Sequence, residues 1–247
     1  MATWRRRHRI ARLPWRMLGR AAAVVAAIAV AVGVGPVTGS RASAAVLSVA
    51  AGAGAGPQTA TYYVTPGPGN CSFPGPPADG LYVALSPPEY ARAARCGSYL
   101  EVSGPDGSVS VKVIDQCPGC AAGHIDLSKT AFARLAPLSA GLIHVAYTYL
   151  ADPPLPGPLS IEVSKGSSRY WLALLADNTG NPLASVELQT SSGWRSLARA
   201  SYNYWIVAGA GSGPFTVRLT DTEGHQVTVP GITLSPGVVQ ATETWMY

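Results

Sequence analysis

Four prolines within seven residues, in the segment DPPLPGP at positions 152–158, divide the 247-residue chain into two parts. Proline fixes φ and has no backbone N–H to give to a helix or a sheet, so this segment is stiff and belongs to neither kind of element. The chain length allows two ordinary domains. We therefore expect two domains, joined by a short linker over residues 151–158 that holds them in a fairly fixed relative orientation.

The part that follows the linker, residues 159–247, alternates short strand-like runs with turn-forming segments. The runs include LSIEV, YWLALLA and FTVRLT, and the breaks include NTGN, GAGSG and TEG. Short runs of β-branched and aromatic residues at this regular spacing are typical of an antiparallel sandwich. The sequence predicts an all-β fold here, an immunoglobulin-like β-sandwich.

The part before the linker, residues 58–150, is organised around the stretch VKVIDQCPGCAAGHIDLS at Val111–Ser128. Three valines alternate with Ser110, Lys112 and Ile114 as far as Asp115, which indicates a strand with one buried face, and a tight Cys-Pro-Gly-Cys loop and a second strand follow. Capping serines predict two short helices, over residues 87–95 and 129–136. Mostly strands with two short helices indicate a small barrel.

The N-terminal segment has the pattern of a bacterial secretory signal. Residues 1–20 hold seven arginines and no acid, an apolar run extends from Ala21 to about Gly35, and an A-x-A sequence occupies positions 42–44. The alternative is an uncleaved anchor helix, but the run is short for a bilayer span of roughly 20 residues. We expect residues 1–44 to be removed and residues 45–57, rich in Ala and Gly, to be a flexible lead-in. The protein would then be secreted and not bound to a membrane.

The formal charge of +5, from 18 basic and 13 acidic residues, belongs mostly to this signal. Eight basic residues precede Ala45 and all 13 acids follow it, which leaves the mature chain at −3. There is also no basic patch interleaved with aromatics, so we expect no nucleic-acid binding.

Four cysteines lie within residues 71–120, and an even number in an exported chain indicates disulfides. Three connectivities are possible. We favour Cys71–Cys96 with Cys117–Cys120, because a Pro-Gly pair holds the last two cysteines close together. The alternatives are a redox motif, which would normally open a helix, and a zinc site to which His124 could contribute. Export favours oxidation, and we expect neither a metal nor a cofactor.

Two carboxylates, Asp115 and Asp126, lie on either side of the Cys-Pro-Gly-Cys loop. A pair of carboxylates is the minimum for cleaving a glycosidic bond, but Asp also often caps turns through backbone N–H groups. The spacing alone does not separate these readings. For His124, between the two acids, we favour a structural hydrogen bond over an acid/base or metal-binding role.

Aromatic residues of the second part are the other candidates. Four of the six tryptophans follow residue 158, namely Trp171, Trp194, Trp205 and Trp245. Flat aromatic faces in a row can stack on pyranose rings and bind a polysaccharide without any catalytic group. Some aromatics of a small sandwich must be core, and we expect this of Trp194 and Trp205.

Together these segments resemble the expansin family. The stretch GSYLEVSGPDGSVSVKVIDQCPGCAAGHIDLSKTAFARLA resembles the first expansin domain, a six-stranded double-psi β-barrel. SSRYWLALLADNTGNPL, SYNYW and PFTVRLTDTEG resemble the second, a family-63 carbohydrate-binding module. The resemblance covers about residues 58–247. The barrel alone would be shared with rare lipoprotein A, barwin-like proteins and family-45 endoglucanases.

The resemblance implies a role for particular residues. In the barrel groove, Asp126 matches the acid that the family needs, Asp115 a supporting acid and Thr61 a groove hydroxyl. On the sandwich, the residues that match an aromatic triad lying on cellulose are Tyr170, Trp171 and Tyr202. Where bacterial members usually carry a groove tyrosine two residues after the first acid, this chain has Cys117.

The resemblance further implies a secreted protein that binds cellulose and other plant cell-wall polysaccharides and loosens them without hydrolysis. Peptidoglycan is a further candidate partner, and we expect a monomer. The alternative is a glycan-cleaving enzyme that uses Asp126 and Asp115, either a family-45-like endoglucanase or a peptidoglycan lytic enzyme. A third reading is a binding module in which both acids are structural.

Overall fold

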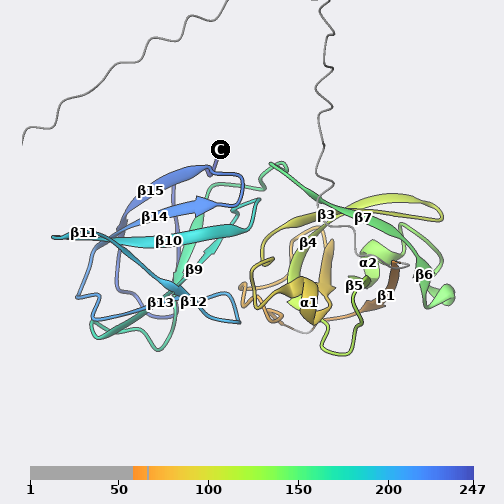
Figure 1. The fold of residues 1–247 in the computed structure, drawn as a ribbon, viewed down its shortest axis with the longest axis horizontal. Helices are drawn as coiled ribbons and strands as arrows, with labels where there is room; N and C mark the ends of the chain where they lie inside the picture. The colour runs from red at the N-terminus through yellow and green to blue at the C-terminus, as the bar shows by residue number, and fades with distance from the viewer. Residues whose placement is uncertain (1–57, 66) are drawn as a thin grey trace, which may run out of the picture. The chain divides into compact units, whose positions relative to one another are not determined.

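The computed structural model describes residues 58–65 and 67–247 (Figure 1). The expected signal segment 1–44 and lead-in 45–57 lie outside the described residues. Within the described part of the chain, no helix is both long enough and apolar enough to span a bilayer.

The first seven strands form one sheet in the order β6-β1-β5-β2-β4-β3-β7. Their bounds are β1 Thr59–Tyr63, β2 Tyr82–Leu85, β3 Tyr99–Gly104, β4 Gly107–Gln116, β5 His124–Ser128, β6 Ile143–His144 and β7 Ala146–Leu150. The end strands β6 and β7 are separated in the chain by Val145 alone, whose N–H donates to the Gln58 carbonyl at 3.0 Å. They are two halves of one interrupted strand, which closes the sheet into a six-stranded double-psi β-barrel.

The barrel interior is filled by the apolar residues that alternate along its strands. In β4, Val109, Val111 and Val113 are buried, as their period of two predicts, but Lys112 and Ile114 on the opposite face are buried too, so the expectation of a single buried face was wrong. Leu100, Ile125 and Leu127 from the neighbouring strands are fully buried in the same core. The parallel pairs β1–β5 and β2–β4 bring together segments that are far apart in the chain.

Both helices of the barrel are shorter than the sequence predicts. Helix α1 covers Pro87–Tyr90 rather than residues 87–95, because the next three residues have left-handed φ values of 49°, 55° and 70° that end the helical path. Helix α2 covers Lys129–Phe132 and a one-turn 3₁₀ helix, η1, covers Leu138–Ala140. The expected cap of α2 is present, since Ser128 Oγ accepts a hydrogen bond from the Ala131 N–H at 3.1 Å.

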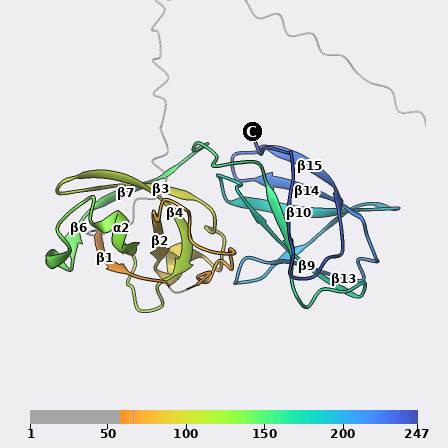
Figure 2. The same ribbon diagram turned by 180° about the vertical axis from the view of Figure 1, so that it is seen from behind.

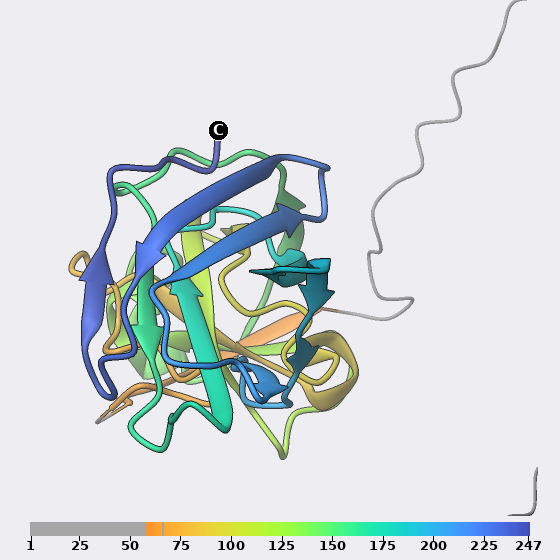
Figure 3. The same ribbon diagram turned by 90° about the vertical axis from the view of Figure 1, so that its left-hand side faces the viewer.

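The remaining strands form two antiparallel sheets that pack as a β-sandwich (Figures 2 and 3). One sheet has the order β11-β10-β14-β15 and the other has the order β12-β13-β9-β8-β16. The bounds are β8 Ser160–Val163, β9 Trp171–Asp177, β10 Leu183–Thr190, β11 Gly193–Ser196, β12 Ala198–Arg199, β13 Trp205–Ala208, β14 Phe215–Asp221, β15 Gln226–Ile232 and β16 Val239–Ala241. A second apolar core lies between the sheets and includes Leu159, Ile161, Val217 and Leu219.

The structure contains two disulfides, Cys71–Cys96 and Cys117–Cys120, with Cα atoms 5.5 and 5.4 Å apart. This is the pairing that we favour from the sequence. All four cysteines belong to these two disulfides, so none of them is free.

Candidate functional site

A row of polar side chains crosses the barrel sheet at one level. The register pairs Thr61 of β1 with Asp126 of β5, Asp126 with Ala84 of β2, and Ala84 with Asp115 of β4. Residues paired in this way project to the same face of a sheet. The two acids are therefore separated by one strand, with Cα atoms roughly 10 Å apart. Ala84, which is 2% exposed, contributes only a methyl group between them.

A chain of hydrogen bonds orients Asp126. The Thr61 hydroxyl donates to Asp126 Oδ1 at 2.7 Å, and His124 Nε2 lies 3.0 Å from the same hydroxyl. Since the single Thr61 proton goes to the carboxylate, His124 must donate from Nε2, which fixes that nitrogen as protonated. His124 Nδ1 lies 2.9 Å from the Thr59 hydroxyl, which completes the chain. The structural hydrogen bond favoured for His124 is thus present, but it supports the groove.

The Asp126 carboxyl is half-buried, and its burial raises its pKa above the ordinary value. The Thr61 hydrogen bond and the nearby His124 act in the opposite direction, and the charge of Asp115 adds to the increase. Desolvation disfavours the ionised form of an acid. Asp126 therefore binds its proton more tightly than an exposed aspartate does.

Asp115 has a different environment, because backbone donors hold it. Its Oδ1 accepts from the N–H groups of Asn70 at 2.6 Å and Gln116 at 2.8 Å. Its Oδ2 lies 3.4 Å from the Tyr63 hydroxyl, a long contact. The carboxylate thus shapes the loop at the end of β4, which agrees with the turn-capping reading, and it also belongs to the row that contains Asp126.

Tyrosines that the sequence reasoning missed complete the groove. Tyr63 is on the same face of β1 as Thr61 and packs edge-on against Tyr82, with ring centroids 5.5 Å apart. Burial, and next the charge of Asp115, raise the pKa of Tyr63, so its hydroxyl stays protonated. The period of two along Thr59, Thr61 and Tyr63 was the available signal. Tyr63 places a phenol near Asp115 although Cys117 occupies the position two residues after that acid.

The candidate aromatic residues of the sandwich differ in exposure. Tyr170 is 67% exposed, Tyr202 is 43% exposed and Trp171 is half-buried. Trp171 begins β9 and pairs with Ala208 of β13, and the guanidinium of Arg169 lies 4.6 Å from the Tyr170 ring centre. Tyr170, Trp171 and Tyr202 together are called the aromatic platform below.

Two further tryptophans were expected in the core. Trp205 is 5% exposed and belongs to the core, as predicted. Trp194 is only half-buried, because it lies on the outer side of β11, where the Arg218 guanidinium covers its ring at 4.2 Å. The expectation for Trp194 was wrong.

Comparison with known proteins gives consistent relatives. The family DPBB_1, described as lytic transglycolase, matches residues 85–147. Expansin-YoaJ of Bacillus subtilis (strain 168) is 32% identical over 160 residues, which cover 62% of this chain and 68% of the relative. The crystal structure of apo Clavibacter michiganensis expansin superposes with a TM-score of 0.74 at 43% identity, over 77% of this chain and 96% of that one. The chain belongs to the expansin family.

A second solved structure is of a mutant of the Clavibacter michiganensis expansin in complex with cellohexaose. It has the same TM-score of 0.74 and 43% identity, and covers 77% of this chain and 97% of that chain. Both domains of the present expansin therefore have counterparts in solved expansin structures.

One cluster in this expansin has metal-ligand atoms close together. Among the described residues, Asp152, Asp221 and His225 present oxygen and nitrogen atoms within 4.8 Å of one another. Asn181 Nδ2 donates to Asp152 at 2.7 Å and to Asp221 at 2.8 Å, and His225 Nδ1 lies 2.9 Å from Asp221. N–H donors thus already occupy these oxygens, and the cluster ties the linker to the sandwich.

Proposed function

We propose that this protein is a secreted expansin that binds cellulose and related cell-wall glycans and loosens them without cleaving them. The aromatic platform would hold the glucan, and the barrel groove would act on it through Asp126. The observation that carries the proposal is the chain from Thr59 through His124 and Thr61 to Asp126, which holds the carboxyl of one acid in a fixed orientation.

The different environments of the two acids support a non-hydrolytic action. Hydrolysis by a carboxylate pair needs one acid to protonate the leaving oxygen and a second carboxylate free to act as base or nucleophile. Asp126 has the properties of the first. Asp115 has two backbone donors on Oδ1, which restrain it as a structural acceptor. The groove therefore exchanges hydrogen bonds with glucan hydroxyls more readily than it breaks a glycosidic bond.

The platform supports cellulose as the ligand class. Exposed tyrosine faces supply large, rigid apolar area at low entropic cost, which suits the flat faces of β-linked glucose rings. The cellohexaose complex of the Clavibacter michiganensis expansin mutant is consistent with this class of ligand.

The test measures loosening and cleavage on the same sample. Cellulose paper is incubated with the wild-type protein and with Asp126→Asn, and its tensile strength and the release of reducing sugar are both followed. We expect wild-type protein to weaken the paper without releasing sugar, and Asp126→Asn to do neither. Steady sugar release that Asp126→Asn abolishes would contradict the proposal.

That contrary result would favour a second function, glycan cleavage with Asp126 as general acid. The match of residues 85–147 to the lytic transglycolase family and the raised pKa of Asp126 are the observations on its side. Release of soluble fragments from purified peptidoglycan would identify the lytic form of this activity.

A further inference from the structure

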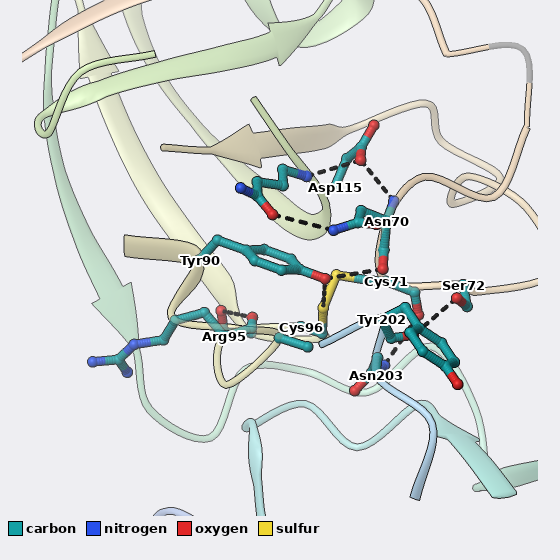
Figure 4. Close-up of a disulfide and its surroundings, with 12 residues drawn as sticks. Asn70, Cys71, Ser72, Tyr90, Arg95, Cys96, Asp115, Tyr202 and Asn203 are labelled. Atoms are coloured by element: carbon teal, nitrogen blue, oxygen red, sulfur yellow. Dashed lines mark hydrogen bonds between the residues drawn. A yellow bond between two sulfur atoms is a disulfide. The ribbon is translucent and has the colours of Figure 1, made fainter. Parts of the chain in front are cut away.

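Three consecutive residues of the loop between β12 and β13, Ser201, Tyr202 and Asn203, form hydrogen bonds to the barrel. Figure 4 shows Tyr202 and Asn203 beside Ser72 and Cys71. The Tyr90 hydroxyl donates to the Ser201 carbonyl at 3.0 Å, and the Ser72 hydroxyl donates to the Tyr202 carbonyl at 2.8 Å. The side-chain amide of Asn203 donates to the Cys71 carbonyl at 3.2 Å. The backbone on both sides of the Tyr202 side chain is therefore held by the other domain.

The barrel side of this contact is itself rigid. Cys71 is bonded to Cys96, and its N–H donates to the Ile114 carbonyl at 3.0 Å. The preceding residue, Asn70, donates its N–H to the groove acid Asp115. The segment Asn70–Ser72 is thus anchored to the barrel by a disulfide and by backbone hydrogen bonds, and Figure 4 shows the disulfide and the Asn70–Asp115 bond.

Tyr90 connects the two sides with one hydroxyl group. It is 1% exposed, and its oxygen lies 2.9 Å from the Asn70 carbonyl and 3.0 Å from the Ser201 carbonyl. Its single proton is shared between an acceptor in the barrel and an acceptor in the sandwich. Burial, and next the charge of Asp115, raise the pKa of Tyr90, so the proton is retained.

We propose that Ser72 and Tyr90 are positioning residues that fix Tyr202 for cellulose binding. The inference rests on the proposed function, in which Tyr202 belongs to the aromatic platform. Tyr202 is exposed and lies in a loop, so its ring needs a rigid backbone to avoid an ordering cost when the ligand binds. The barrel supplies that rigidity, so Ser72 and Tyr90, which lie outside the platform, influence the affinity of the platform for cellulose.

A double-mutant cycle on the full chain tests this coupling. Ser72→Ala should weaken binding to microcrystalline cellulose by roughly two- to tenfold, the value of one hydrogen bond. In a Tyr202→Ala background the same substitution should have no further effect, because the residue to be positioned is gone. The matched control is Ser108→Ala, at an exposed barrel serine, which should leave binding unchanged. Equal losses in both backgrounds, or no loss in either, would overturn the proposal.

Hydrogen exchange without cellulose keeps the proposal separate from the proposed function. Exchange of the peptide that covers residues 200–205 should rise in Ser72→Ala and in Tyr90→Phe, by roughly the same two- to tenfold factor. If Tyr202→Ala binds cellulose as well as wild-type protein, the platform role fails, while raised exchange still supports positioning of the loop. Unchanged exchange in both variants would refute the positioning role even if cellulose binding is as proposed.

Discussion

The barrel groove and the aromatic platform reach their geometry by opposite means. In the groove, strand register places Thr61 beside Asp126, and hydrogen bonds from His124 complete the orientation. On the platform, Tyr170 precedes a strand and Tyr202 lies in a loop, and both side chains are exposed. The groove is thus prepared by secondary structure, whereas the platform depends on tertiary contacts such as those of Ser72. Only substitutions of the groove residues themselves should impair the groove. The platform should also be impaired by substitutions at residues distant from it.

The largest effect should come from Asp126→Asn, which should abolish the loosening activity without destabilising the fold. The amide oxygen still accepts the Thr61 proton, and the cost of a half-buried charge disappears, so the melting temperature at pH 7 should be equal or higher. Weakening of cellulose paper should be lost. Thermal unfolding and paper strength, measured on the same preparation, check both halves. A large fall in the melting temperature would show that Asp126 is structural, as in the binding-module reading.

A next effect should come from Lys112→Met, which breaks an ion pair between the barrel and the sandwich. Lys112 of β4 pairs with Asp177 at the end of β9, and its ammonium lies 4.3 Å from the Phe73 ring centre. Its side chain is 8% exposed and that of Asp177 is 22% exposed. Removing one partner of a buried pair leaves the other uncompensated, so we expect a loss of about 3 kcal/mol in the free energy of unfolding.

Denaturant titration measures the Lys112→Met effect. The double variant Lys112→Met/Asp177→Leu is the control, because it removes both charges and should recover much of the stability. If the single variant is as stable as wild-type protein, the pair does not hold the barrel against the sandwich.

A smaller effect should come from Trp171→Ala on the platform. Loss of the aromatic contact should weaken cellulose binding by about 1 kcal/mol, or roughly fivefold, without altering the groove. Trp194→Ala is the matched control, since Trp194 lies on the other sheet of the sandwich and is also half-buried. Pull-down isotherms on cellulose distinguish the two variants, and equal losses would show that the platform is not the binding face.

The smallest effect should be a pH dependence of stability at the linker cluster. The hydrogen bond with Asp221 raises the pKa of His225 in the folded protein. The stability that protonated His225 contributes is therefore complete below its unfolded pKa of about 6.5 and is lost as pH rises through its folded pKa. Burial acts to raise the pKa of Asp221, but hydrogen bonds from Asn181 and His225 lower it overall. The stability that ionised Asp221 contributes is therefore complete above its unfolded pKa of about 3.9 and is lost as pH falls through its folded pKa.

The melting temperatures of wild-type protein and His225→Gln should consequently differ most between about pH 4 and 6.5 and converge in more alkaline buffer. His144→Gln, at an exposed histidine of β6, is the control and should show no such window. A constant difference across the pH range would assign the role of His225 to packing against the Tyr247 ring, 4.9 Å away.

The sequence was informative wherever periodicity or resemblance carried the signal. Alternation predicted β4 and the sandwich strands, and the resemblance identified Asp126, Asp115 and Thr61, which the register then places in one row. The end of α1 was not predictable in this way. Ala91, Arg92 and Ala93 are ordinary helix formers, yet they adopt left-handed φ values in the segment that leads to Cys96, which is bonded to Cys71.

Contacts between distant loops were also beyond sequence reasoning. Ser72 and Tyr202 are 130 positions apart, and neither side chain carries a pattern that announces its partner. The same holds for Tyr63, which reaches Asp115 only because β1 and β4 belong to one closed sheet.

The closure of the barrel by the interrupted strand β6–β7 also constrains how quickly it can fold. The first strand, β1, pairs with β5 and β6, so Thr59 meets partners 65 and 85 positions later, at His124 and His144. Pairings of such long sequence separation slow folding, because the loop entropy is lost before the contacts form. The barrel should therefore fold more slowly than the hairpin-rich sandwich, and β1, whose two edges stay unpaired until β5 and β6 join it, should be the segment most prone to aggregation during refolding.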